Sequence, residues 1–150
     1  MTTYTESITV NRPLKEVTGL FKDTSQYKDW QPELEEYETF VGHPGEEGSK
    51  ARLRKHAPKG AGIKMKQTVE KDNLPEEYVI KQDTDGVMAH HHFHFHDNDT
   101  ATQIEARGEY DTDGFMKLVD WFKPSYFENQ LKEYLENFKE FAENQTGPTP

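Results

Sequence analysis

The sequence predicts an α+β fold of order β-α-α-β6-α, in which a curved antiparallel sheet of about seven strands wraps around a long C-terminal helix. Apolar and polar residues alternate from residue 34 to residue 110, and short turn segments interrupt the alternation. Between residues 114 and 143 apolar residues instead recur every three or four positions. A sheet with one apolar face and a helix with one apolar stripe can bury both against each other.

The first element is predicted as a strand over residues 5–11, because Ile8 and Val10 alternate with polar residues. Pro13 then favours the first turn of a helix. The apolar residues of that helix recur at helical spacing: Leu14, Val17, Leu20 and Phe21. Asp23-Thr24-Ser25 ends it and can cap a second short helix over residues 26–30, which Pro32 terminates.

Six strands are predicted in the middle of the chain. They cover residues 34–41, 50–56, 62–71, 76–83, 87–97 and 101–110. Gly, Pro, Asn and Asp fill the gaps between them, which is the composition of tight turns. Strands joined by such short turns pair in an antiparallel meander.

A long amphipathic helix is predicted over residues 114–143. Its apolar stripe consists of Phe115, Leu118/Val119, Phe122, Tyr126/Phe127, Leu131, Tyr134/Leu135, Phe138 and Phe141/Ala142. Pro124 lies inside the pattern, so we expect the helix to kink there or to lose its first turns as a separate piece. We interpret residues 1–144 as a single domain and residues 145–150 as a flexible tail.

The composition of the chain is unusual for a folded domain. The formal net charge is −10, the mean hydropathy is −1.04, and Leu, Ile, Val and Phe make up fewer than a fifth of the 150 residues. These values are typical of disorder. However, the chain has 18 aromatic residues, almost as many as its 19 Leu, Ile and Val residues, and disordered chains are poor in aromatics. We therefore expect a folded domain with an aromatic core.

Several classes of protein are excluded by composition. No apolar run approaches the ~18–20 residues of a membrane helix, and no signal sequence is visible, so we expect no membrane insertion and a cytoplasmic location. The absence of cysteine excludes disulfides and thiolate chemistry. The acidic charge argues against nucleic acid as a partner, and the oligomeric state stays open. Five basic residues lie in and just after the strand predicted over residues 50–56, and we interpret them as a solvated strand face rather than a phosphate site: Lys50, Arg52, Arg54, Lys55 and Lys59.

A series of short motifs runs through the chain in a characteristic order. Ile8-Thr9-Val10-Asn11-Arg12-Pro13 is followed by Val17-x-x-Leu20-Phe21-x-Asp23 and Tyr27-x-x-Trp30-x-Pro32. Further motifs are Gly45-x-x-Gly48-Ser49, Asp99-Thr100 and Leu131-x-x-x-Leu135-Glu136-Asn137-Phe138-Lys139. Over residues 6–143 this order resembles the START-like (SRPBCC) superfamily, the polyketide cyclase/dehydrase and lipid-transport group. The resemblance implies a helix-grip fold with a ligand cavity between the concave sheet face and the long helix.

Side-chain alternation along each strand predicts which residues would line the cavity implied by the resemblance. Phe93 and Phe95 require the inner face, which also places Ala89 and His91 there, and the neighbouring strands follow the same rule. The candidate ligand-binding residues are Met65, Gln67, Tyr78, Gln82, His91, Phe93, Ile104, Tyr110, Phe127 and Leu131. A closed core in which these side chains satisfy one another is the alternative.

Five of the seven histidines lie in His90-His91-His92-Phe93-His94-Phe95-His96. Alternation places four of them on one face, where H-x-H pairs could hold zinc, nickel or copper, facing Gln103, Glu105, Arg107 and Glu109. One straight strand does not by itself close a tetrahedron of ligands. We therefore predict no metal site and interpret the four as a solvent-exposed face whose imidazoles titrate, with a pH response as a further possibility.

The function predicted from the sequence is non-catalytic binding or transport of a small hydrophobic ligand, lipid-like or aromatic, without a cofactor. No nucleophile elbow, phosphate-binding glycine loop or His-Glu-x-x-His motif is present. An alternative is a cyclase- or hydrolase-like enzyme that uses an inward His91 with Tyr110. A third hypothesis is a protein-interaction module whose aromatic helix contacts a partner.

Overall fold

The computed structural model describes residues 2–56, 62–118 and 125–145. Within these ranges, seven strands, three longer helices and two short helical segments follow one another in the order predicted from the sequence, with the last helix in two pieces. The elements are β1 (Thr2–Val10), α1 (Leu14–Lys22), η1 (Thr24–Gln26), α2 (Tyr27–Trp30), β2 (Leu34–Val41), β3 (Lys50–Lys55), β4 (Ile63–Asn73), β5 (Glu77–Thr84), β6 (Val87–Asn98), β7 (Ala101–Tyr110), α3 (Thr112–Leu118) and α4 (Ser125–Glu143).

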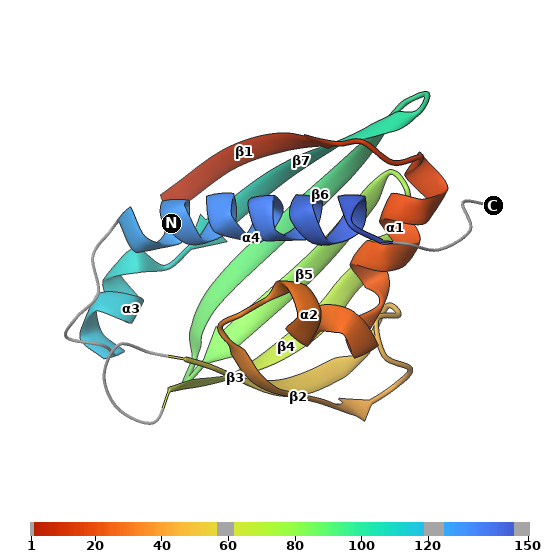
Figure 1. The fold of residues 1–150 in the computed structure, drawn as a ribbon. Coiled ribbons are helices and arrows are strands. Elements are labelled where there is room, and N and C mark those ends of the chain that lie inside the picture. Colours follow the sequence, from red (N-terminus) through yellow and green to blue (C-terminus); the bar gives the residue numbers. More distant parts are fainter. Residues whose placement is uncertain (1, 57–61, 119–124, 146–150) are drawn as a thin grey trace.

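The strands form one antiparallel sheet in the order β1-β7-β6-β5-β4-β3-β2. Strands β2 to β7 are the predicted meander, and β1 joins its far edge by pairing with β7, with Ile8 opposite Ile104. Figure 1 shows α4 lying across the sheet, with α1 beside its C-terminal end and α3 beside its N-terminal end. The predicted architecture of a curved sheet that wraps around a long helix is confirmed.

The helix predicted over residues 114–143 is present as two helices. α3 ends at Leu118 and α4 begins at Ser125. Pro124, Val119 and Phe122 of the predicted stripe lie outside the described residues. A helix that begins directly after a proline agrees with the expectation that Pro124 separates the first turns from the rest.

The core is aromatic, as the composition predicts. Phe21 of α1 is its centre, with six other rings whose centroids lie between 4.8 and 6.1 Å away: Trp30, Tyr78, Phe93, Phe95, Tyr134 and Phe138. Most of these pairs are edge-to-face, an arrangement that adds about 0.5–1.5 kcal/mol per pair to the hydrophobic contribution. Aromatic rings thus replace much of the aliphatic interior of an ordinary domain.

The predicted inner faces of the strands are confirmed by burial. Gln67 and Val69 of β4, Ile80 of β5, and Ile104 and Ala106 of β7 are all buried. Val79 is a departure, because it is buried although it belongs to the opposite face of β5. Among the described residues, no helix is long and apolar enough to cross a membrane.

Candidate functional site

A cavity of about 50 Å³ lies between the inner face of the sheet and the two C-terminal helices. Its floor comes from β3 to β7, and its cover comes from Phe115 of α3 and from Phe127 and Leu131 of α4. The wall is mainly apolar and aromatic, with a few polar groups from His91, Tyr110 and Gln82. Pockets that bind drug-sized ligands measure about 300–1,000 Å³. The enclosed space therefore holds a few waters or a small chemical group unless side chains move.

His91 and Tyr110 form a hydrogen-bonded pair in this wall. The His91 Nε2 atom lies 2.9 Å from the Tyr110 hydroxyl oxygen. The two residues come from adjacent strands, where His91 is paired in register with Gly108, so the Tyr110 side chain reaches back along β7. A Cβ atom built on Gly108 would lie only 2.4 Å from the Tyr110 hydroxyl oxygen, so only glycine leaves room for this ring.

Burial lowers the pKa of His91 to about 3, with further lowering by Lys55 and by the neighbouring His90 and His92. The imidazole is therefore neutral at neutral pH. A base with so low a pKa takes up protons poorly at neutral pH, which argues against His91 as a general base. Burial also raises the pKa of the Tyr110 hydroxyl, so the phenol stays protonated. The pair is suited to hydrogen bonding with a ligand rather than to proton transfer.

Two further contacts hold the wall in place. The Gln82 side-chain amide donates a 2.9 Å hydrogen bond to the Gln67 side-chain oxygen across β5 and β4. On the opposite side, the Tyr110 ring stacks on Phe127 of α4 with centroids 4.1 Å apart and an interplanar angle of 12°. Strands and helix are thus joined at the cavity by specific polar and aromatic contacts.

The structure brings together six of the ten residues predicted to line a pocket. Met65, Gln82, His91, Tyr110, Phe127 and Leu131 lie in the cavity wall. The other four are buried away from it: Gln67 hydrogen bonds to Gln82, Tyr78 donates to the Gly45 carbonyl at 2.6 Å, and Phe93 and Ile104 pack in the core. Ligand binding by any of the ten stays a prediction.

Lys55 is the main wall residue that sequence reasoning missed. It was grouped with the solvated basic cluster, but its side chain lines the cavity. Lys50 and Arg52 of that cluster are exposed, as expected, and Lys59 lies outside the described residues. The correction follows from alternation along β3: Ala51 and Leu53 are buried, so the next residue on their face is Lys55.

The helix side of the wall was also incomplete in the sequence prediction. Tyr126, Gln130 and Tyr134 of α4 and Phe115 of α3 line the cavity together with Phe127 and Leu131. Helical periodicity had identified most of these residues as one stripe, but it does not say where along a stripe a cavity lies. That depends on how far α4 stands from each strand.

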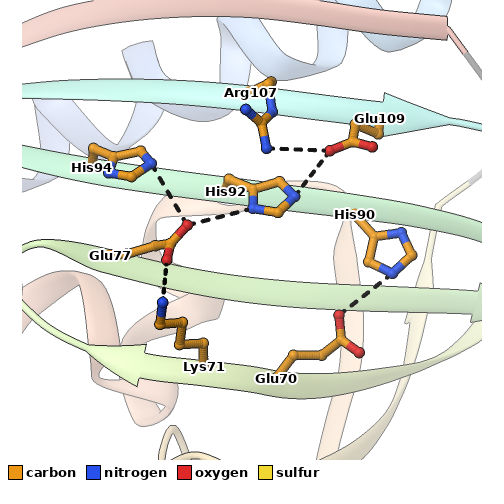
Figure 2. A network of polar contacts seen from close by, with 8 residues as sticks. All are labelled: Glu70, Lys71, Glu77, His90, His92, His94, Arg107 and Glu109. Carbon is orange, nitrogen blue, oxygen red and sulfur yellow. Dashed lines mark hydrogen bonds and ion pairs between the residues drawn. The ribbon is translucent and has the colours of Figure 1, made fainter.

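A second cluster of polar residues occupies the opposite face of the sheet, around the histidines of β6 (Figure 2). His92 Nε2 lies 3.0 Å from Glu109 Oε1 on β7, and its Nδ1 lies 3.7 Å from Glu77 Oε2 on β5. His94 Nε2 lies 3.7 Å from the same Glu77 oxygen. Each of these imidazoles therefore faces carboxylates of the neighbouring strands rather than a second imidazole.

Cations complete this network. Lys71 Nζ lies 2.7 Å from Glu77 Oε1, and Arg107 lies 3.4 Å from Glu109 Oε1. The hydrogen bond from Lys71 is the main cause that lowers the pKa of Glu77. Within residues 2–56, 62–118 and 125–145, no three His, Asp or Glu side chains have an arrangement that could hold a metal ion. Glu109 was among the predicted partners of the histidines. Glu77 was not, and neither was Glu70, whose Oε1 atom lies 3.4 Å from His90 Nε2.

The aromatic residues of α4 face inward. Phe127 and Phe138 are buried, and Tyr126, Tyr134 and Phe141 are partly buried. In the described part of the chain, the exposed large hydrophobic residues are Phe40, Val41 and Met116, and none of them belongs to α4. The helix surface that the interaction-module hypothesis requires is therefore directed at the sheet.

Comparisons with solved structures identify the fold. The protein TTHA0849 from Thermus thermophilus superposes with a TM-score of 0.72 at 17% identity, covering 94% of this chain and 97% of its own. Ara h 8.0201 gives a TM-score of 0.71 at 10% identity, covering 96% of this chain and 99% of its own.

Norcoclaurine synthase from Thalictrum flavum, solved with dopamine and hydroxybenzaldehyde, gives a TM-score of 0.66 at 11% identity, with 97% and 89% covered. At these identities the likeness establishes the fold alone. No curated protein matches the sequence. The family model for polyketide cyclase/dehydrase and lipid transport matches residues 1–143. The chain therefore belongs to this family of the START-like superfamily, and the helix-grip fold expected from the sequence is confirmed.

Proposed function

We propose that this protein binds a small hydrophobic ligand, most suitably a compact aromatic molecule, in the cavity between the sheet and α4. The observation that carries the proposal is the composition of the wall: aromatic and aliphatic side chains surround a few polar groups that point to one place. This is the usual chemistry of small-molecule pockets, where apolar contacts supply affinity and a few polar groups fix orientation.

The size of the cavity favours an aromatic ring over a long acyl chain. About 50 Å³ of free space admits a compact group, and a longer ligand would have to displace several buried rings. Wall residues such as Ile63, Met65 and Tyr126 are only partly buried, so they are the side chains best placed to yield to a ligand. The norcoclaurine synthase structure contains two aromatic molecules, which supports an aromatic ligand for this fold as an analogy.

An NMR titration with benzyl alcohol, which carries a single aromatic ring and one hydroxyl group, tests the proposal. We expect saturable binding of one probe per chain, because the cavity offers one site. Replacing the buried wall residue Ala89 by Val and then by Leu should weaken the probe stepwise, since each added carbon fills the cavity. A steric cost of about 1–3 kcal/mol for the Leu variant corresponds to about a tenfold loss of affinity or more.

Ala101→Leu provides the matched control, because Ala101 lies at the other end of the sheet, beside the turn between β6 and β7. Circular dichroism of each variant verifies the fold. Probe binding that does not saturate at one per chain, or that is equally strong in folded Ala89 and Ala101 variants, would refute the cavity as the binding site.

A further inference from the structure

Lys55 is a cationic residue in an otherwise aromatic site. It is the last residue of β3, paired in register with Leu34 of β2 and Ile63 of β4. Its side chain lines the 50 Å³ cavity and also a smaller adjoining cavity of about 20 Å³, and Gln130 and Tyr134 likewise border both spaces. Lys55 therefore lies where the two cavities meet.

The strand end that carries Lys55 is fixed in position. The backbone amide of His56 donates a 2.7 Å hydrogen bond to the carbonyl of Glu33, in the turn before β2. The Glu33 carboxylate in turn accepts hydrogen bonds of 2.8 and 2.7 Å from the Gln130 side-chain amide on α4. Glu33, the carboxylate that acts electrostatically on Lys55, is thus already hydrogen-bonded to a neutral side-chain amide.

The Lys55 amine has no ion pair within 4.0 Å and no side-chain hydrogen bond among the residues that the structure describes. Burial lowers the pKa of this amine, and the opposing influence of Glu33 is smaller. Neighbouring His91 is neutral at pH 7, and the Tyr110 phenol keeps its proton. The neutral, nucleophilic form of the amine is therefore more populated here than on a surface lysine.

We propose that the Lys55 amine forms an imine with a small aromatic aldehyde that enters the cavity. This proposal rests on the proposed function, because the cavity must first accept the ring. The nitrogen lone pair attacks the carbonyl carbon, and the carbonyl π electrons move to oxygen. A proton passes from nitrogen to oxygen to give the carbinolamine. The carbinolamine then loses its hydroxyl group together with the remaining N–H proton as water, while the nitrogen lone pair forms the C=N bond. No oxidant or reductant is consumed.

Reductive trapping tests the imine. Wild-type protein is incubated near pH 7 with benzaldehyde and sodium cyanoborohydride, and the benzylated peptides are mapped by mass spectrometry. Because burial lowers the pKa of the Lys55 amine, we expect Lys55 to be modified at least about tenfold faster than the exposed Lys66. Benzyl alcohol, which cannot form an imine, should slow the reaction at Lys55 and leave Lys66 unaffected.

Variants and competition separate this proposal from the proposed function. Lys55→Arg should abolish the fast adduct, whereas Lys66→Arg should retain it; Lys55→Met serves as a second variant if the arginine disturbs folding. If the wild type binds benzyl alcohol but labels Lys55 no faster than Lys66, the imine proposal is overturned and the binding proposal stands. If Lys55 labels fast but the probe neither binds nor competes, the amine is reactive without a ligand pocket and the proposed function fails.

Discussion

His91 illustrates how the fold changes the chemistry of a single residue. The side chain belongs to a run of histidines, yet it alone of the five turns to the inner face, where it contacts Tyr110. Burial and three nearby groups that can carry positive charge oppose its protonation. A residue that titrates near neutral pH in an unfolded chain is therefore held neutral in the folded protein.

Stability should consequently fall on acidification because of His91. Its pKa is about 3 in the folded state against an ordinary value of 6.5. Between these values the unfolded chain binds a proton that the folded chain does not. The free energy of unfolding therefore decreases as the pH falls below 6.5, by up to about 1.4 kcal/mol per pH unit for this one proton. His91→Gln keeps a hydrogen-bonding side chain without titration and should flatten this slope.

Urea denaturation followed by circular dichroism between about pH 7 and pH 4.5 measures the effect. His96→Gln is the matched control, because His96 lies on the same strand but is exposed on the outer face. The slope of the control should equal that of the wild type. Equal slopes in the His91 variant and the wild type would mean that His91 is protonated in the folded protein.

Lys55 shows what residue-level reasoning from sequence can and cannot find. Its inward position could be read from the alternation of Ala51 and Leu53, both buried on the same face of β3. Its charge, however, favours assignment to a solvated face, and five basic residues close together strengthen that assignment. Alternation predicts that Lys55 points inward, whereas its charge predicts that it points to solvent. Only the presence of a cavity at this end of the sheet shows which prediction holds, and a cavity cannot be seen in a sequence.

At the scale of elements, the loop between β2 and β3 determines how one end of the interior is closed. The Gly45 carbonyl accepts the hydrogen bond from the buried Tyr78 hydroxyl, and the Gly48 amide donates to the Val69 carbonyl at 2.8 Å. Both glycines have positive φ angles, 80° and 86°. The loop is thus attached to β5 and β4 through two glycines with different surroundings.

Replacing these glycines by alanine should separate backbone strain from steric contact. A Cβ at Gly48 meets nothing within 4 Å, so Gly48→Ala should cost only the left-handed strain of about 1–2 kcal/mol. A Cβ at Gly45 would lie 2.6 Å from the backbone oxygen of Lys22 at the end of α1. Gly45→Ala should therefore destabilise by about 1–3 kcal/mol more. Urea titrations give both values, and equal losses would mean that the loop moves away from α1 freely.

Element boundaries were predicted best where turn chemistry is strong. β2 and β7 begin and end at the predicted residues, between segments rich in Gly, Pro and Asp. For the C-terminal helix the apolar period continues across Pro124, so the proline alone, and not the period, indicated that the first turns would separate from the rest. Periodicity records which side of a helix is buried, whereas continuity depends on backbone geometry.

At the scale of the whole molecule, the sheet order follows from local turns except at one edge. Six strands pair with their neighbours in the chain, but β1 pairs with β7, which lies far away in the sequence. The C-terminal end of β1 also meets the end of α4, where the Asn11 amide donates to Glu143 and Lys139 donates to the Thr9 carbonyl. Such long-range contacts leave no local pattern, so the sequence could predict that the first strand joins the sheet but not that it pairs with β7.

The net charge of −10 makes electrostatic repulsion a property of the molecule as a whole. At about 0.01 M salt the Debye length is ~30 Å, so most carboxylates repel one another, whereas at about 0.15 M it is ~8 Å. We expect the melting temperature to rise from the lower to the higher salt concentration, because salt weakens the repulsion between carboxylates. The same screening costs little stability at exposed ion pairs such as Lys71–Glu77, since these pairs contribute little stability in the first place.

Glu136→Lys, on the exposed side of α4, should raise the melting temperature at low salt and reduce its dependence on salt. The conservative Glu136→Gln should give half of this change, because it removes one unit of charge rather than two. A melting temperature that falls as sodium chloride is added would mean that ion pairs such as Lys71–Glu77 outweigh the repulsion.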